Sequence, residues 1–205
     1  LSTKFPYESP FDASDSRQPK GVLVFGINGG GLWPGPSVDP HTGIMYVATN
    51  NTGRILPSLK DFRDHEGFYG NKPPWGKLTA LDLNTGKIKW SVPLGDDKRL
   101  KKRGFKNIGT KNICGPLATS GGLVFCGGTT DKLFRAFDKQ TGKLVWSRKM
   151  PAYGSAAPTT YEIDNKQYII VPATGGVTGT LYRDMSIDTS DDFDFDASDA
   201  FVVFS

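Results

Sequence analysis

One strand–turn–strand pattern occurs twice in this chain, and it restricts the fold more than any other feature. Residues 76–90 read GKLTALDLNTGKIKW, and residues 131–146 read DKLFRAFDKQTGKLVW. When Trp90 is aligned with Trp146 (146 minus 90, an offset of 56), the Ala, Asp, Thr-Gly-Lys and Trp of both segments coincide. Self-similarity at a period of some tens of residues is typical of folds built from repeated, stacked units.

Each copy belongs to a longer unit of four short strands. In the first unit we expect strands at 36–39, 44–49, 77–82 and 87–92, and in the second at 117–119, 122–128, 133–138 and 143–146. A third unit begins at 157–163 and 167–172, and residues 200–204 resemble its next strand. Short β-rich runs joined by Gly-containing turns form antiparallel hairpins, and four-stranded sheets repeated around an axis form a β-propeller.

The chain therefore reads as one all-β domain over residues 1–205, a partial β-propeller with four-stranded antiparallel blades. The expected parts are an outer strand of one blade at about 21–25, followed by blades at 36–92, 117–148 and 157–205. Closed propellers contain roughly four to eight blades, and proteins normally cover sheet edges. We expect this chain to be the C-terminal part of a larger propeller or to oligomerise.

The residues shared by the two copies have structural roles in this interpretation. Asp82 and Asp138 precede Thr-Gly turns, where a carboxylate accepts backbone N–H groups and Gly takes a positive φ. Trp90 and Trp146 end the outer strands, where a large flat ring covers the gap to the next blade.

Composition and charge exclude several classes of function. The 25 Gly and 14 Pro of 205 residues interrupt the chain too often for long helices. Basic residues cluster at 98–111 and acidic residues at 184–199, with a net charge of +4. The basic cluster has one Phe beside it and no nucleic-acid-binding module around it, so we expect no nucleic-acid partner. No apolar run approaches the ~18 residues of a membrane span, and the start at Leu-Ser-Thr suggests a mature product or a piece of something longer.

Two cysteines, Cys114 and Cys126, flank the first expected strand pair of the second unit. A disulfide between them is conceivable, but the expectation is two buried free thiols within the sheet. Two cysteines say little about the redox compartment.

The motif Ala-x-Asp-x-x-x-Gly-x-x-x-Trp, at 80–90 and again at 136–146, resembles the tryptophan-docking motif of pyrroloquinoline quinone (PQQ) dehydrogenases. These are eight-bladed propellers. Further segments resemble, in order, the last third of the membrane-bound glucose, quinate and polyol dehydrogenase branch: GVLVFGINGGGLWPGPSVDP (21–40), PPWGKLTALDLNTGKIKW (73–90), GPLATSGGLVFCGGTTDKLFRAFD (115–138), MPAYG (150–154) and NKQYIIVPATGG (165–176). The resemblance covers nearly the whole chain.

The order of the strands predicts two unlike rims. One rim carries the long connections 26–34, 50–75, 95–114 and 174–199, and the other carries the tight turns near His41, Asn84 and Gln140. Functional loops on a rigid scaffold are where chemistry is usually placed. We therefore expect any site on the rim with the long loops.

The resemblance implies that PQQ lies on that rim, near the axis. It maps two cofactor-approaching residues onto Asn28 and Trp33, and it places Ile113 under or beside the cofactor with Cys114 replacing a Gly next to it. Without the resemblance, the Gly-rich run after Asn28 reads as a flexible turn, and Cys114 reads as a small buried hydrophobe.

Two acidic groups were considered as metal sites. Asp61, Asp64, His65 and Glu66 lie in one loop, but their spacing matches no oxygen cage, which favours a solvated loop. Asp192, Asp194 and Asp196 resemble a calcium loop without its Gly and closing Glu, which favours a solvated tail with calcium as the alternative.

By resemblance, the parent protein is a PQQ-dependent dehydrogenase that oxidises an alcohol or aldose. PQQ would accept hydride, Ca²⁺ would polarise its carbonyl, and a membrane quinone would receive the electrons. The family's catalytic base and calcium ligands lie on earlier blades, so this chain alone is expected to be inactive. The resemblance also implies a periplasmic location, with membrane association through an N-terminal segment outside this sequence. The alternative is a PQQ-like propeller that acts as a scaffold or binding module without a cofactor.

Overall fold

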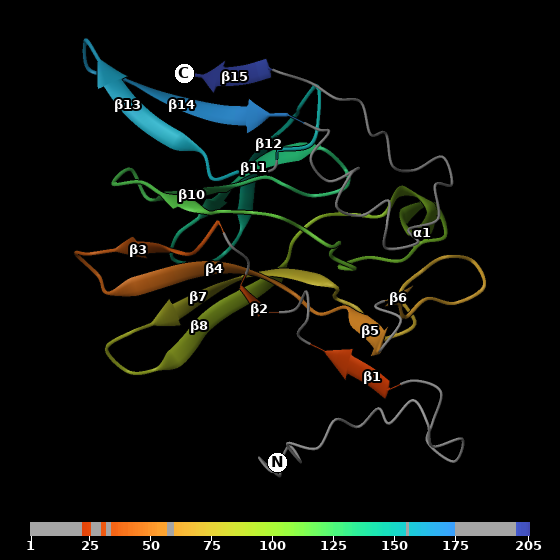
Figure 1. Cartoon of the computed structure of the whole chain (residues 1–205). Helices are drawn as coiled ribbons and strands as arrows, with labels where there is room; N and C mark the ends of the chain where they lie inside the picture. Colours follow the sequence, from red (N-terminus) through yellow and green to blue (C-terminus); the bar gives the residue numbers. More distant parts are fainter. Residues whose placement is uncertain (1–21, 26–29, 32–33, 57–59, 155, 175–199) are drawn as a thin grey trace.

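The computed structural model describes residues 22–25, 30–31, 34–56, 60–154, 156–174 and 200–205. Strands dominate these ranges, and one short helix, α1 (Lys98–Lys102), lies among them (Figure 1). The strands are β1 (Val22–Phe25), β2 (Gly30–Gly31), β3 (Ser37–Asp39), β4 (Ile44–Asn50), β5 (Gly53–Leu56), β6 (Lys60–Asp61), β7 (Gly76–Asp82), β8 (Lys87–Pro93), β9 (Leu117–Ala118), β10 (Leu123–Cys126), β11 (Leu133–Asp138), β12 (Leu144–Lys149), β13 (Thr159–Ile163), β14 (Lys166–Ala173) and β15 (Ala200–Phe204).

The first sheet is the first repeat unit. Strands β3, β4, β7 and β8 pair in that order and antiparallel, and β2 pairs with the far end of β4. The alternating burial of β4 and β7 shows that one face of this sheet is packed and the other is more open. The four expected strands of this unit are all present.

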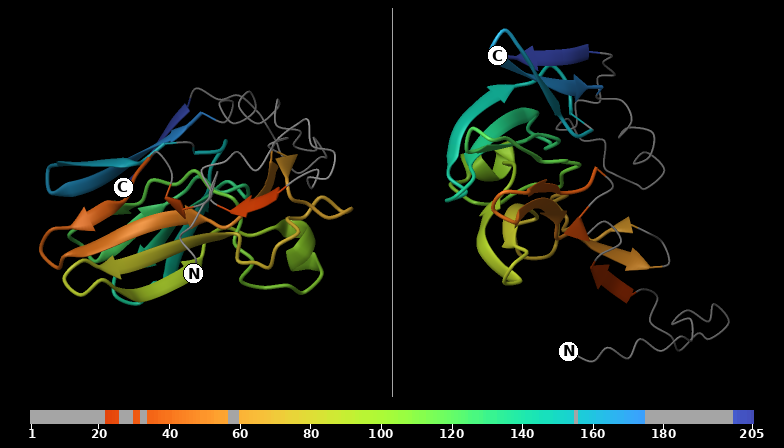
Figure 2. Two further views of the ribbon diagram at one scale, coloured as in Figure 1. Left: turned by 60° about the horizontal axis from the view of Figure 1, so that its bottom comes forward. Right: turned by 90° about the vertical axis from the view of Figure 1, so that its left-hand side faces the viewer.

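The second and third sheets follow the same plan. Strands β9 to β12 form a four-stranded antiparallel sheet, and β13, β14 and β15 form a three-stranded one. The three sheets lie one after another in space, as blades do (Figure 2). The all-β propeller class expected from the repeat is confirmed, and 36–92, 117–148 and 157–205 stay our proposed blade boundaries.

The N-terminal strand pairs differently from the expectation. A strand does form at β1, but its partner among the described residues is β5, in a small sheet β1-β5-β6. Strands β5 and β6 belong to the long connection between β4 and β7, so β1 extends that connection and is not the outer strand of a described blade. The repeat could not predict this pairing because the connection has no counterpart in the second unit.

Trp90 joins the first sheet to the second. Its indole Nε1 donates to the carbonyl oxygen of Lys139 at 3.0 Å, and its ring lies 5.8 Å from the ring of Tyr46. A one-residue bulge interrupts the β7–β8 pairing after Ala80, and the β11–β12 pairing has the same bulge after Ala136. Each bulge lies directly before the tryptophan on the outer strand, so the same backbone irregularity orients the indole ring in both copies.

Two buried clusters fill the gaps between the sheets. Ile44, Tyr46, Leu78, Val124 and Phe137 belong to the cluster between the first and second sheets. The cluster between the second and third sheets contains a stack of Phe125, Phe134 and Phe204, against which Trp146 packs edge-on. The second sheet is therefore covered on both faces.

The outward faces of the first and third sheets are apolar but exposed in the described structure. Ile88 is 64% exposed on the first sheet, and Phe201 is 68% exposed on the third. These faces support a larger assembly of blades, which stays a proposal.

The turn chemistry of the repeat is confirmed. Asp82 Oδ1 accepts from the Asn84 N–H at 2.9 Å, and Asp138 Oδ1 accepts from the Thr141 N–H at 2.8 Å. Gly86 and Gly142 have φ values of 69° and 71°, in the left-handed region.

Substitution of these two glycines can measure how much the contact between the Trp90 ring and Gly142 contributes to stability. A Cβ at Gly142 would lie 2.7 Å from the Trp90 ring, whereas a Cβ at Gly86 would have no heavy atom within 4 Å. We expect Gly86→Ala to cost about 1 kcal/mol for its positive φ, and Gly142→Ala to cost a further ~1–3 kcal/mol because it overpacks the tryptophan. Urea unfolding of both variants measures the difference, and equal losses would contradict docking.

Candidate functional site

The long connections and the tight turns lie on opposite rims (Figure 1). The β3–β4 and β7–β8 turns point to the left of that view, while α1, β5 and β6 lie at the right. The rim with the long connections is called the loop rim below, and the other is the turn rim.

The segment that enters the second sheet on the loop rim is fixed by a pair of buried asparagines. Asn50 Nδ2 donates to the Asn112 carbonyl oxygen at 2.8 Å, and Asn50 Oδ1 accepts from the Asn112 N–H at 2.9 Å. Asn112 Nδ2 also donates to Asn50 Oδ1 at 2.9 Å. Because Asn50 ends β4 and Asn112 precedes β9, this clasp joins two sheets at the rim. It satisfies polar groups that would be costly to bury alone.

Ile113 lies next to this clasp and is 6% exposed. Its N–H donates to the Gly128 carbonyl oxygen at 2.9 Å, which ties the segment to the end of β10. Gly128 has a φ of 64°, and a Cβ there would lie 2.6 Å from the Ile113 carbonyl oxygen. A side chain at position 128 would therefore push this expected cofactor-facing residue out of place.

The expectation of two free thiols is wrong. Cys114 and Cys126 form a disulfide, with their Cα atoms 6.0 Å apart, and both side chains are buried in the cluster between the first and second sheets. The hydrogen bond between Ile113 and Gly128 brings the entry segment beside β10, within the range at which two cysteines can bond. The sequence did not reveal this pairing because it depends on that tertiary contact.

The other two expected cofactor residues, Asn28 and Trp33, lie outside the described residues. The part of their loop that is described is β2, whose Gly30 and Gly31 pair with Asn50 and Thr49. The middle of that loop, at Gly30 and Gly31, therefore runs beside the same end of β4 that holds Asn112. Two expected segments thus meet at Asn50.

A buried charged group lies near the same segment. Asp61 accepts from Arg54 Nε at 3.1 Å and from an Arg63 terminal nitrogen at 3.3 Å, and the Arg54 and Asp61 side chains are 2% and 3% exposed. Burial lowers the pKa of Lys111 to about 7, Asp61 opposes this shift, and the two arginines add to it. This group is called the rim cation group below: Arg54, Arg63, Lys111 and Asp61. Three basic side chains in it face one carboxylate.

Three of the four candidate metal ligands in the loop at 61–66 form ion pairs or hydrogen bonds within the protein. The expectation of a solvated loop is wrong for Asp61, which is buried in ion pairs. Asp64 accepts from the N–H groups of Glu66 and Phe68 at 2.9 Å each. Glu66 forms a two-pronged ion pair with Arg103. In the described part of the chain, no three His, Cys, Asp or Glu residues are grouped as metal ligands. Asp192, Asp194 and Asp196 lie outside the described residues.

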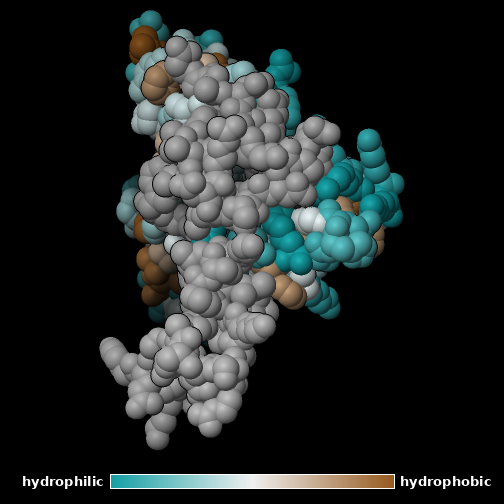
Figure 3. Space-filling view, turned by 45° about the vertical axis from the view of Figure 1, so that its right-hand side comes forward, coloured by the Kyte–Doolittle hydropathy of each residue, from teal (hydrophilic) through white to brown (hydrophobic). Residues whose placement is uncertain are grey.

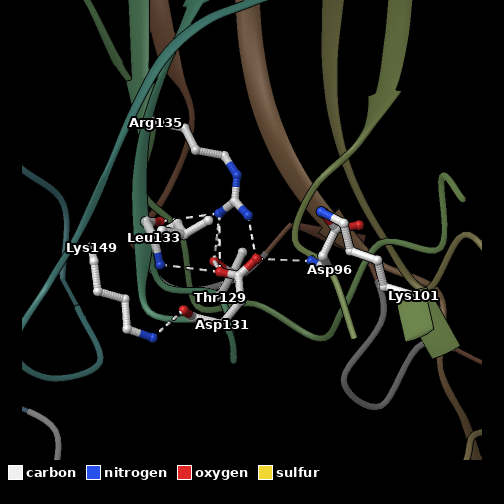
Figure 4. A network of polar contacts seen from close by, with 7 residues as sticks. All are labelled: Asp96, Lys101, Thr129, Asp131, Leu133, Arg135 and Lys149. Carbon is white, nitrogen blue, oxygen red and sulfur yellow. Dashed lines mark hydrogen bonds and ion pairs between the residues drawn. The ribbon is translucent and has the colours of Figure 1, made fainter. Parts of the chain in front are cut away.

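Sequence reasoning missed one buried network on the loop rim (Figure 4). Arg135 bonds both oxygens of Asp131, which also accepts from the Thr129 hydroxyl and from the Asp96 N–H at 2.9 Å. Burial alone would raise the pKa of Asp131, but the bonds and charge of Arg135 outweigh it and hold the pKa low. The signal was present in the repeat, because Arg135 stands where the first copy has the uncharged Thr79.

One hollow in the described surface lies on the turn rim. This groove of about 870 Å³ is lined by residues of both sheets, including Val38, Ala118 and Lys139. Lys139 Nζ bonds to Asp39 at 2.5 Å, and this bond is the main cause that lowers the pKa of Asp39 to about 2. The two charged side chains Asp39 and Lys139 in its lining are thus already paired with each other.

The loop rim fits a planar, anionic cofactor in three respects. The rim cation group contains three basic side chains and one carboxylate, and basic side chains bind carboxylate-bearing ligands well. Among the described residues, Thr52 Oγ1 and Thr110 Oγ1 are buried without a hydrogen-bond partner, and each is close in sequence to a member of that group. Ile113, two residues after Lys111, adds an apolar side chain to this segment that is 6% exposed, and flat cofactors require apolar neighbours.

Comparison with known proteins gives a consistent result. The family model described as "PQQ: Glucose/ethanol/alcohol dehydrogenase, beta-propeller domain" matches residues 54–169, more than half of the chain. The glycerol dehydrogenase large subunit of Gluconobacter thailandicus is 41% identical over 199 positions, which cover 73% of this chain and 27% of the relative. The quinoprotein glucose dehydrogenase of Escherichia coli is 31% identical over 174 positions, covering 82% and 20%. The chain spans about a quarter of the length of these relatives.

Solved structures agree on the fold. The quinohemoprotein alcohol dehydrogenase of Comamonas testosteroni superposes with a TM-score of 0.51 at 23% identity, covering 74% of this chain and 24% of that one. A europium-containing methanol dehydrogenase gives a TM-score of 0.50 at 24% identity, covering 78% and 27%.

The disulfide should stabilise the chain. A loop closed by cysteines 12 residues apart restricts the unfolded state, so the Cys114→Ser, Cys126→Ser variant should lose about 2–3 kcal/mol of unfolding free energy. Urea titration measures this loss. Two thiols that react with a maleimide in denaturant without reductant would contradict the bond.

Lys111 should make stability depend on pH in one direction. Its folded pKa of about 7 lies below the ordinary lysine value of 10.5, so the unfolded chain binds more protons between these values. Stability should therefore rise with pH above 7. The free energy of unfolding of Lys111→Met, relative to that of the wild type, should therefore be higher at pH 6.5 than at pH 8.5. Lys89→Met, an exposed position, serves as the control, and a pH-independent difference for Lys111→Met would sink the idea.

Proposed function

The chain belongs to the PQQ-dependent glucose/ethanol/alcohol dehydrogenase family of β-propellers, and from this we propose that it is part of a quinoprotein dehydrogenase acting on polyols, sugars or related alcohols. The family match over residues 54–169 is the observation that carries this proposal. Because the chain spans about a quarter of its relatives, the activity is assigned to the protein of which it is the C-terminal part.

The names of the relatives support the substrate class. They are glycerol, glucose and quinate/shikimate dehydrogenases, whose substrates all carry secondary hydroxyl groups among several others. We leave the individual substrate open within this class.

In this proposal, the loop rim of this chain forms one flank of the PQQ site. PQQ, when bound, supplies a quinone that accepts hydride from the alcohol carbon. Ile113 supplies an apolar surface for its rings, and the positive charge of Lys111 and its neighbours favours its carboxylates. Asn28 and Trp33 stay proposed contacts. Cys114 is proposed at the site through its disulfide, which holds the Ile113 segment in place.

The remaining machinery is proposed to lie on other blades. The ligands of a calcium ion would lie outside this chain, and so would the catalytic base. We propose a membrane quinone as the electron acceptor, since two quinate dehydrogenase relatives are named for a quinone. Within the described residues, no helix is long and apolar enough to cross a membrane. A periplasmic location and oligomerisation of the isolated chain are likewise proposals.

Reconstitution of the full-length parent protein tests the function. Addition of PQQ and Ca²⁺ to the apoprotein should give dye reduction with glycerol or glucose. Lys111→Met should weaken PQQ binding at least several-fold, because it removes a cation from the rim cation group, whereas Lys89→Met on the turn rim should not. PQQ binding is followed by quenching of tryptophan fluorescence.

Two results would overturn the proposal. Absence of both PQQ uptake and dye reduction in the folded parent would favour the scaffold alternative. Equal PQQ affinity in the Lys111→Met and Lys89→Met variants, with circular dichroism unchanged, would remove the rim cation group from the site.

A further inference from the structure

We propose that residues 98–106, called the basic tip, form a docking surface for an anionic phospholipid membrane. The tip comprises α1 and the turn that follows it, and it reads KRLKKRGFK. Lipid binding by the tip does not depend on the proposed function. If that function holds, the same contact also turns the loop rim, with its proposed cofactor site, toward the membrane.

Half of the cations in the tip are free to meet an external anion. Arg103 pairs with Glu66, Lys101 with Asp96 at 3.2 Å, and Arg99 with Asp97 at 3.8 Å. The other three basic side chains are exposed and have no carboxylate partner in the described part of the chain: Lys98, Lys102 and Lys106. Each lysine near an anionic bilayer surface contributes about 1 kcal/mol of attraction.

An exposed aromatic ring lies among these lysines. Phe105 is 58% exposed, at the turn where Gly104 has a φ of 87°. An aromatic ring beside basic side chains suits the membrane interface, because the ring enters the headgroup region while the cations contact phosphates.

The tip is held by a buried base. The Arg99 and Arg103 guanidinium groups lie 4.3 and 5.5 Å from the centre of the Phe68 ring. Leu100 packs against the cluster of Phe68, Trp75 and Ile108. Asp97 caps α1 by accepting from the N–H groups of Arg99 and Leu100. Because one side of the helix is fixed in this way, the backbone that carries these lysines needs little ordering on binding.

The position of the tip suits contact with a flat surface. Helix α1 lies at the outer edge of the loop rim (Figure 1), and hydrophilic side chains gather on the right-hand flank of the view that brings this side forward (Figure 3). A protein partner would need roughly 800 Å² of complementary surface, whereas the tip offers one exposed ring. Attraction to a membrane needs only charge and a small apolar contact, which favours lipid over an acidic protein.

Vesicle flotation of the chain tests this proposal without PQQ or substrate. The chain should bind vesicles of phosphatidylcholine mixed with phosphatidylglycerol, should not bind phosphatidylcholine alone, and should be released by high salt. Lys98→Glu, Lys102→Glu, Lys106→Glu should weaken binding at least about tenfold. Phe105→Ser should weaken it several-fold, whereas Phe201→Ser, at an exposed ring on the third sheet, should not.

A matched control separates the tip from net charge. Lys87→Glu, Lys89→Glu, Lys143→Glu changes the net charge equally at exposed positions beside the turn rim, and it should retain most of the binding. Equal loss in both triple variants, or equal binding to neutral vesicles, would overturn the proposal. Circular dichroism confirms that each variant is folded. A dehydrogenase that binds PQQ but no vesicles would leave the proposed function intact.

Discussion

The contact between Trp90 and the second sheet is the interaction on which the rest of the structure depends. Its indole N–H bonds the Lys139 carbonyl oxygen, and its ring lies over Gly142, a position with no room for a side chain. That contact closes the outer side of a cluster in which Tyr46, Leu78 and Val124 are fully buried. With the two sheets fixed in this way, their loop-rim ends come close enough for the Asn50–Asn112 clasp to form.

The clasp, the disulfide and the Ile113–Gly128 bond all act on one short segment. Asn112 is held by the first sheet, while Ile113 and Cys114 are held by the second. A segment fixed on both sides keeps the Ile113 and Lys111 side chains in a defined relation, and the proposal that this segment flanks a cofactor requires such rigidity. The rim is thus organised by the Asn50–Asn112 contact between the first two sheets together with the Ile113–Gly128 and Cys114–Cys126 contacts within the second unit.

The two rims of the molecule differ in the residues that they carry. The turn rim carries short turns in which Asp side chains accept hydrogen bonds from backbone N–H groups, and two of its charged residues, Asp39 and Lys139, form an ion pair. The loop rim carries the rim cation group, the Asp131 network and the basic tip. The rim cation group lies on two long connections, whereas Arg135 and Asp131 lie on β11 and in the short segment before it. These buried charges all lie on the loop rim.

The repeat alone determined the sheets, because strand period, Thr-Gly turns and spaced tryptophans are local signals that tertiary contacts did not overrule. It also determined which rim carries the long loops. The pairing of β1 with β5, the Cys114–Cys126 disulfide and the burial of Asp61 were decided only by the tertiary structure. In each case the residues in contact lie on different strands or connections. A local sequence pattern carries no information about contacts of this kind. The family of the chain could be read from its residues, whereas the arrangement of Asn50, Asn112 and Lys111 around Ile113 required the folded sheets.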